Sequence, residues 1–379
     1  MPAPRPGPDG TPATTHTSKP HPLDGVALRA RVAEVIDTHL SAQREIVVEI
    51  GEPVLDLIDE ISDLLSGGKR LRAAFLYWGY RAFGGSDSTA LVRAASAMEL
   101  FQAAALLHDD VMDHSDLRRG RPTAHRAFAA RHEQAAWSGS STEFGLAAAT
   151  LAGDMCLNWS DELFAGSGLP AEQLHRARPT FDTMRTQLMG GQYLDVLTSA
   201  QEWTHLSHEE RLDQCLRVIR YKSAKYSIEH PVLLGASAIG APKSAQKLLS
   251  DFGLALGEAF QLRDDILGVF GDPQSTGKPA GDDIREGKRT VLIATALRLG
   301  TPSQERTLTH GLGDPELSDA DLADIREALT ASGAVHQVED MISLGRSRAT
   351  EALDRIEEMT TEGRHALHAL IDISTSRQV

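Results

Sequence analysis

Residues 106–123, LLHDDVMDHSDLRRGRPT, combine four aspartates with three arginines, namely Asp109, Asp110, Asp113, Asp116, Arg118, Arg119 and Arg121. In a helix, Asp109 and Asp113 lie one turn apart on one face. Carboxylates this close repel each other unless a cation lies among them. Mg²⁺ prefers oxygen ligands and often shares them with substrate phosphates, and arginine is suited to binding phosphate oxygens. The stretch therefore indicates a site for a metal ion and a phosphorylated ligand. The alternative is a solvated acidic helix end, which the apolar Leu106 and Leu107 disfavour.

A second stretch, residues 261–290, repeats the same combination. It contains two Asp-Asp pairs and several cations, namely Asp264, Asp265, Asp282, Asp283, Lys278, Lys288 and Arg289. Two acidic helices that face each other across a cavity are able to hold several Mg²⁺ ions around one diphosphate.

An ordered set of motifs now makes the chain resemble the trans-isoprenyl diphosphate synthases, most of all the bacterial geranylgeranyl diphosphate synthases. The motifs are GGKRLR (67–72), DDVMD (109–113), RRGRPT (118–123), GQYLD (191–195), YKSAKYS (221–227), FQLRDD (260–265) and GKPAGDD with GKRT (277–290). The resemblance covers about residues 25 to 375. Each motif alone is weak, whereas their order along the chain is highly specific.

The resemblance implies a head-to-tail prenyl transfer from an allylic diphosphate to isopentenyl diphosphate. It also implies that Asp109, Asp113 and Asp264 bind two or three Mg²⁺ ions, with Asp265 as a water-mediated acceptor. Asp110, Lys222 and Gln261 complete the implied catalytic group.

The resemblance also assigns residues to each substrate. Lys69, Arg72 and Arg119 are implied to hold isopentenyl diphosphate. The allylic substrate is assigned Arg118, Lys222 and Lys278 for its diphosphate and Gln192 for its reactive chain. Arg70, Gln102 and Lys288 are further expected substrate-binding residues.

Three positions depart from the family pattern. Ala73 stands where a proline is usual, Gln102 where many members have a histidine, and Gly268 where the second motif has its third aspartate. Gln102 offers only an amide hydrogen bond, and Asp264 lacks a carboxylate four residues further on.

Product length is predicted from the helix before Asp109. In the family that the chain resembles, aromatic residues at the positions four and five before the first aspartate are expected to limit the product to fifteen carbons. The residues here are Ala105 and Ala104, which are small. Phe101 is the next large residue, about two turns or 11 Å away. We therefore predict geranylgeranyl diphosphate, with twenty carbons, as the product.

Composition excludes other classes of function. The chain has 38 basic and 53 acidic residues, a formal net charge of −15, which argues against nucleic-acid partners and anionic membrane surfaces. Two cysteines in 379 residues make no disulfide framework, so we expect a cytoplasmic protein. No apolar run reaches the roughly 18 residues of a membrane span, so we expect no stable membrane insertion.

The elements that must position these residues are helices. Residues 1–22 contain seven of the seventeen prolines and are predicted to be a disordered tail. Residues 23–379 show helical periodicity nearly throughout, broken by Gly, Pro and Ser clusters. We predict one all-α prenyltransferase domain, a large helical bundle like that of the isoprenoid synthases around a central cavity. The resemblance implies a homodimer.

Two other functions remain open. A class I terpene cyclase also uses an aspartate-rich helix, but the Asn/Asp-Ser/Thr-Glu motif usual for its second metal site is not found here. The cations Lys69 and Arg72 also imply a second diphosphate, which a cyclase does not need. A non-catalytic regulatory subunit of a prenyl synthase is expected to have lost its aspartates, and this chain keeps most of them.

Overall fold

The computed structural model describes residues 22–203, 205–272 and 281–375. The tail predicted to be disordered, apart from Pro22, lies outside this range, and so does Lys278.

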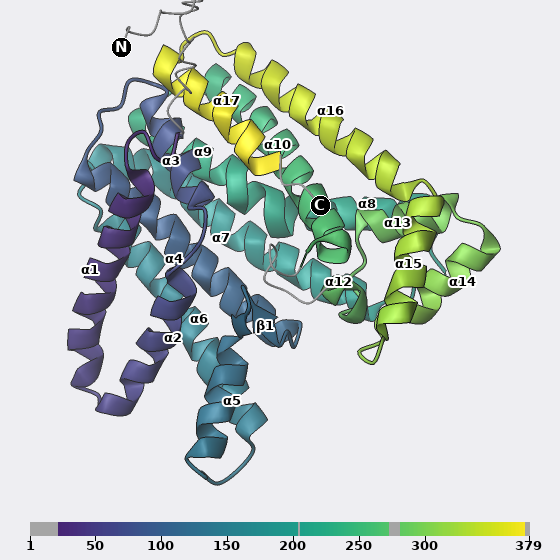
Figure 1. Cartoon of the computed structure of the whole chain (residues 1–379). Helices are drawn as coiled ribbons and strands as arrows, with labels where there is room; N and C mark the ends of the chain where they lie inside the picture. The colour runs from purple at the N-terminus through teal and green to yellow at the C-terminus, as the bar shows by residue number, and fades with distance from the viewer. Residues whose placement is uncertain (1–21, 204, 273–280, 376–379) are drawn as a thin grey trace, which may run out of the picture.

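The described chain is built from helices and one very short hairpin (Figure 1). Its elements are α1 (Leu28–Val48), η1 (Glu52–Val54), α2 (Leu55–Leu65), α3 (Leu71–Arg81), α4 (Thr89–Met112), β1 (Leu117–Arg118), β2 (Arg121–Pro122), α5 (Ala124–Gln134), α6 (Ser141–Ala165), α7 (Ala171–Ala200), α8 (His208–Val218), η2 (Ile219–Glu229), α9 (His230–Ile239), α10 (Lys243–Phe270), α12 (Asp282–Arg285), α13 (Val291–Leu299), α14 (Pro302–Gly311), α15 (Asp319–Ala331), α16 (Ala334–Asp354) and α17 (Thr361–Thr375).

The helices form one bundle with two hydrophobic cores. The larger core joins α1–α4, α6, α7, η2, α9, α10, α16 and α17, and the smaller one joins α8, η2, α10 and α12–α16. Helix α10 contributes to both, so it ties the main bundle to the lobe formed by α13, α14 and α15 (Figure 1). The prediction of an all-α bundle is confirmed.

Helix α4 is the central element. Ser88 begins it, because its side chain accepts a hydrogen bond from the backbone nitrogen of Leu91 as an N-cap does. Among the described helices, α4 alone is long and apolar enough to cross a membrane. This differs from the expectation that no apolar run reaches that length. However, 72% of the most apolar stretch of α4 is buried inside the bundle, as expected for a core helix.

A two-residue turn displays the arginines that follow α4. Leu117 pairs with Pro122 and Arg118 with Arg121, which leaves Arg119 and Gly120 at the tip. Both tip residues have positive φ, 54° and 75°, as a hairpin turn of this length requires. The sequence analysis did not predict this hairpin, because two residues per strand are too few for an alternating pattern.

Candidate active site

A lysine from η2 joins carboxylates from two other helices. Lys222 Nζ lies 2.7 Å from Asp109 Oδ1 on α4 and 2.5 Å from Asp195 Oδ2 on α7. Gln192, also on α7, donates from Nε2 to Asp109 Oδ1 over 3.0 Å. Four residues from three segments that are far apart in sequence therefore meet at one point, and three of them were predicted site residues.

Local backbone geometry makes this meeting possible. Residues 219–229 form a π-helix, a rare form that often occurs at functional sites, and Lys222 lies within it. Gly191 on α7 packs directly on this segment, since a β-carbon there would lie 2.4 Å from the Lys222 backbone nitrogen. Only glycine therefore lets α7 and η2 come this close.

The two main aspartates of α4 have opposite electrostatic environments. Burial opposes the charge of Asp109, but Lys222, Lys288 and Arg118 together hold its pKa below the ordinary value. Burial raises the pKa of Asp113, and the nearby carboxylates of Asp109 and Glu286 add to the rise against the effect of Lys288.

Lys288 connects the first acidic motif with the segment after the second. Its Nζ lies 2.6 Å from Glu286 Oε2, 3.1 Å from Asp113 Oδ2 and 3.5 Å from Asp283 Oδ1. Ser115 donates from Oγ to Glu286 Oε1 over 2.6 Å and fixes that carboxylate. Burial disfavours the charge on Lys288, but Asp283, Asp113 and Glu286 raise its pKa well above the ordinary value.

The second acidic motif lies near the end of α10. Gln261 donates from Nε2 to Asp265 Oδ1 over 2.9 Å, and Asp265 is buried. Burial raises the pKa of Asp265 to about 8, with Asp283 and Asp264 adding to the rise. Asp264 is half-buried beside it. Gln261 is therefore placed to orient the carboxylate next to the predicted metal ligand.

The hairpin arginines behave differently from each other. Arg118 donates from Nε to both carboxylate oxygens of Asp110, at 2.9 and 3.1 Å, and lies 3.5 Å from Asp109 Oδ2. Asp110 is buried, so this ion pair is part of the interior. Arg119 donates to the carbonyl of Leu64 over 3.0 Å at the surface. The guanidinium of Arg119 lies against Gly67 and Gly68 of the GGKRLR motif, since a β-carbon at Gly68 would lie 3.2 Å from Arg119 Nη2.

The basic residues of that motif point in different directions. Lys69 is exposed, whereas Arg70 is buried and lies 3.4 Å from Glu99, which makes Arg70 part of the support. Glu99 also accepts a hydrogen bond of 3.2 Å from the backbone nitrogen of Ala73. A proline at residue 73 would lack this N–H donor, so the alanine that replaces the usual proline makes the hydrogen bond to Glu99 possible.

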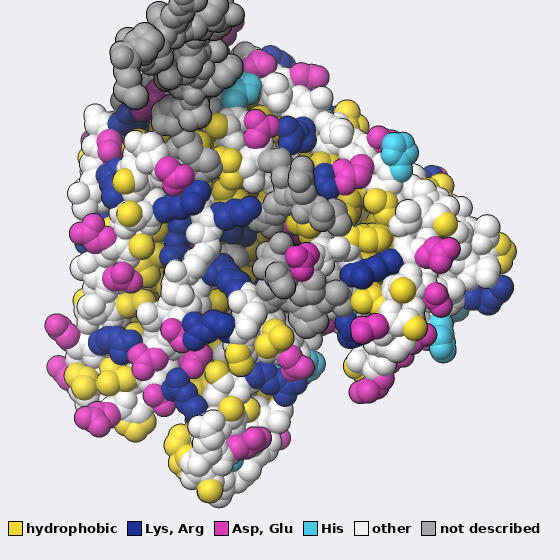
Figure 2. All heavy atoms as spheres, viewed as in Figure 1, with side chains coloured by type: hydrophobic (Ala, Val, Ile, Leu, Met, Phe, Trp, Pro, Cys, Tyr) yellow, Lys and Arg dark blue, Asp and Glu magenta, His cyan; other side chains and the backbone are white. Residues whose placement is uncertain are grey.

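Arg72 is held by a short polar chain. It donates to Tyr226 Oη over 2.9 Å and to Ser227 Oγ over 2.6 Å, and its guanidinium lies 4.6 Å from the centre of the Tyr226 ring. Tyr226 Oη in turn donates to Gln102 Oε1 over 2.8 Å. Gln102 and Arg72 are thus joined through one hydroxyl. Figure 2 shows Lys and Arg side chains gathered in the middle of the face over α3 and β1.

The predicted product-length residues are not equivalent. Ala104 is fully buried, whereas Ala105 is partly exposed and faces the same way as Asp109, one turn below it. Phe101 is buried and its ring makes an edge contact with Tyr226, with 6.1 Å between the ring centres.

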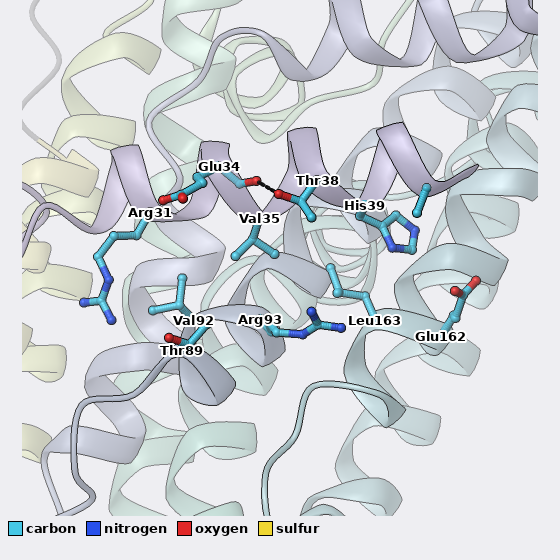
Figure 3. A pocket seen from close by; sticks show the side chains of 11 residues that line it. Arg31, Glu34, Val35, Thr38, His39, Thr89, Val92, Arg93, Glu162 and Leu163 are labelled. Carbon is cyan, nitrogen blue, oxygen red and sulfur yellow. Dashed lines mark hydrogen bonds between the residues drawn. The ribbon is translucent and has the colours of Figure 1, made fainter. Parts of the chain in front are cut away.

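Two polar residues without an assigned role in the site have their own ion-pair partners. Lys225 pairs with Glu229 over 2.7 Å, and Asp116 pairs with Arg126 over 2.6 Å. A separate cavity of about 400 Å³ lies between α1, α4 and α6 (Figure 3). Its Arg93 precedes Asp109 by 16 residues, or about 24 Å along a helix, so the cavity is distinct from the acidic site.

Three residues of the site, Asp195, Tyr226 and Glu286, were not assigned to it from the sequence, whereas Asp283 was noted in the second acidic stretch without a specific role. Asp195 follows Gln192 by three residues, a helical spacing that already indicates a shared face. Glu286 and Asp283 come from a segment whose position only the folded chain defines.

Carboxylate oxygens here meet the requirements of a hard cation. One oxygen each of Asp109, Asp113 and Asp195 lie within 4.8 Å of one another, which suits Mg²⁺. In addition, Asp265 Oδ2 is buried without a hydrogen-bond partner among the described residues. The donors present therefore fit the metal that the sequence implies.

The family model for polyprenyl synthetases matches residues 56–329. The chain belongs to this family. It is 31% identical to the geranylfarnesyl diphosphate synthase of Aeropyrum pernix, over 82% of this chain and 91% of that protein. It is 34% identical to the geranylgeranyl diphosphate synthase of Sulfolobus acidocaldarius, over 68% and 71% of the two chains.

A solved structure is also similar throughout. The geranylgeranyl pyrophosphate synthase from Corynebacterium glutamicum, complexed with isoprenyl diphosphate and magnesium, superimposes with a TM-score of 0.87 and 39% identity. The match covers 93% of this chain and 99% of that one. This polyprenyl synthetase is therefore a prenyltransferase of isoprenoid biosynthesis that elongates prenyl diphosphates, as the motifs predicted.

Proposed function

We propose that this polyprenyl synthetase joins isopentenyl diphosphate head-to-tail to an allylic diphosphate and releases mainly geranylgeranyl diphosphate. The observation that carries the proposal is the position of Lys288, whose ammonium contacts both Asp113 at the C-terminal end of α4 and Asp283 beside α10. The two acidic motifs thus border one space, as a diphosphate held between them requires.

We assign two or three Mg²⁺ ions to Asp109, Asp113 and Asp264. When bound, Mg²⁺ neutralises the negative charge that grows on the leaving diphosphate. Arg118 and Lys222, and Lys278 outside the described residues, supply further positive charge at the same place. Charges fixed in this way stabilise the transition state more than the ground state, which lowers the barrier.

The second diphosphate requires its own donors. Arg72, held by Tyr226 and Ser227, is placed to orient isopentenyl diphosphate together with Lys69 and Arg119. The double bond of isopentenyl diphosphate then attacks the allylic carbon as the C–O bond to the leaving diphosphate breaks. The proton lost afterwards passes to the released diphosphate. Apolar side chains such as Phe101 keep water away from the cationic carbon.

The small side chain of Ala105 and the ring of Phe101 support a twenty-carbon product. The relatives from Sulfolobus acidocaldarius and Corynebacterium glutamicum are named for this product, and the Aeropyrum pernix relative for one of twenty-five carbons.

A homodimer is also part of the proposal. Large apolar side chains are exposed on α6 and α7, namely Phe144, Leu151, Met189, Tyr193 and Val196. An apolar surface of this kind is typical of subunit contacts. We also place the protein in the reducing cytoplasm, since Cys156 and Cys215 are free and buried.

An assay with labelled isopentenyl diphosphate and each allylic primer, with and without Mg²⁺, tests the function. Elongated diphosphates that form only with Mg²⁺ are expected. Cyclic hydrocarbons from an allylic substrate alone would indicate a terpene cyclase. Activity that requires a second synthase would indicate a regulatory subunit.

A further inference from the structure

The second acidic motif has lost its third aspartate at Gly268, and the structure shows what lies there instead. A β-carbon at Gly268 would lie 1.8 Å from Oδ2 of Asp283 and 2.6 Å from its Cγ. Such distances are far below any van der Waals contact, so a side chain at residue 268 would require the carboxylate of Asp283 to move from the place it occupies here.

This contact brings Asp283 to the helix face that the motif needs. Gly268 follows Asp264 by four residues, the spacing at which side chains of a helix are neighbours. Asp283 belongs to α12, which packs on α10 at this point. Its carboxylate therefore lies against α10 where the side chain of a third aspartate would begin.

Two further contacts connect Asp283 with the site. Its Oδ1 lies 3.5 Å from Lys288 Nζ, the same atom that contacts Asp113 of the first motif. Asp265 is 6% exposed, and its Oδ2 has no hydrogen-bond partner among the described residues. A buried carboxylate oxygen without a donor is costly unless a cation binds there.

We propose that Asp283 replaces the missing third aspartate, so that the second Mg²⁺–diphosphate site is shared between α10 and α12. Gly268 is then required, because it provides the space that Asp283 occupies. This inference rests on the proposed function, in which Asp264 binds Mg²⁺. It explains why a prenyltransferase functions with an incomplete second motif.

The test uses the full chain with Mg²⁺ and inorganic diphosphate. Thermal melting measures how much the two ligands stabilise the protein, and calorimetry measures the affinity for diphosphate in the presence of Mg²⁺. Asp283→Ala is expected to weaken diphosphate binding by about 10-fold or more. Gly268→Asp alone is expected to weaken it as well, since the new side chain displaces the carboxylate of Asp283. The double variant G268D/D283A is expected to recover binding to within about threefold of wild type, as interdependent residues do in a double-mutant cycle.

Two controls distinguish a specific loss of diphosphate binding from a general charge effect and from unfolding. Asp324→Ala removes an exposed carboxylate on α15 and should leave binding unchanged. Melting without ligand reports whether each variant folds, and D283A adds no atoms that a fold must accommodate. Wild-type diphosphate binding by D283A, or a folded double variant no better than G268D, overturns the inference. Because diphosphate binding is measured rather than turnover, an absence of prenyl product in the wild type overturns only the proposed function.

Discussion

Gly191 lies directly against Lys222, and a β-carbon at residue 191 would come within 2.4 Å of the lysine's backbone nitrogen. The ammonium of the same lysine reaches Asp109 over 2.7 Å. The absence of a side chain at residue 191 thus allows Lys222 to reach the carboxylate of Asp109, to which we assign Mg²⁺.

Gly191→Ala is expected to reduce turnover more than about 10-fold, because backbone atoms of η2 must move to admit the methyl group and take Lys222 away from Asp109. The neighbouring glycine provides the control, since a β-carbon at Gly190 meets nothing within 4 Å. Gly190→Ala should leave activity unchanged and stabilise α7 by about 0.5–1 kcal/mol. Equal activity in the two variants would mean that the close approach has no role in catalysis.

Substitutions at Asp109 and Asp110 are expected to affect different properties, turnover at Asp109 and stability at Asp110. Asp110→Ala leaves the largely buried guanidinium of Arg118 without its main partner, so it should cost about 3–5 kcal/mol of unfolding free energy. Asp109→Asn should abolish turnover at a smaller cost, because Lys222 retains Asp195 as a partner. Urea unfolding combined with product assays measures both effects. A loss of stability in D109N as large as that in D110A would contradict the distinction.

The two diphosphates are expected to use separate cations. Arg72→Ala should raise the KM for isopentenyl diphosphate about 10-fold or more and affect the allylic KM little. Lys222→Ala should do the reverse, because it lies beside Asp109 rather than Tyr226. Steady-state kinetics with each substrate varied in turn separates them. Variants that weaken both substrates equally would show a shared site.

Product length is expected to respond differently at the two alanines. Ala105→Phe should shift the product to farnesyl diphosphate, because residue 105 is partly exposed below Asp109. Ala104→Phe should instead cost about 1–3 kcal/mol of stability, because residue 104 is fully buried in the core. Phe101→Ala should give longer products. Chromatography of the dephosphorylated alcohols shows the outcome, and three unchanged profiles would place the tunnel elsewhere.

Acid is expected to destabilise the fold through His230. Burial lowers its pKa from 6.5 to about 4, with Lys225 acting the same way and Glu229 opposing. The unfolded chain therefore binds a proton at a higher pH than the folded protein. The stability from this residue is complete above pH 6.5 and is lost as the pH falls towards 4, by about 1.4 kcal/mol per pH unit.

His230→Gln should reduce this pH dependence when urea unfolding is compared at about pH 7.5 and about pH 5, which lie on either side of the ordinary pKa of histidine. His125, whose pKa burial also lowers to about 4, remains as a second contributor. Parallel curves for the variant and the wild type would exclude His230 as a source.

The sequence alone determined the helical fold and the main acidic residues. Gly, Pro and Ser clusters mark where helices end, and caps such as Ser88 follow from local hydrogen bonding. Asp109 and Asp113 needed only a helical spacing to be predicted as a pair. Local rules of this kind act within a few residues, so they are visible in the order of amino acids.

Only the tertiary structure decided which segments meet. Nothing local indicates that Gly268 leaves space for Asp283, or that Tyr226 joins Arg72 to Gln102. It also distinguished the inward-facing Arg70 from the exposed Lys69, two neighbours that are equal as charges in the sequence. The contacts of Gly268 and of Tyr226 join residues 15 to 154 positions apart, and the packing of whole helices, rather than any short pattern, brings such residues together.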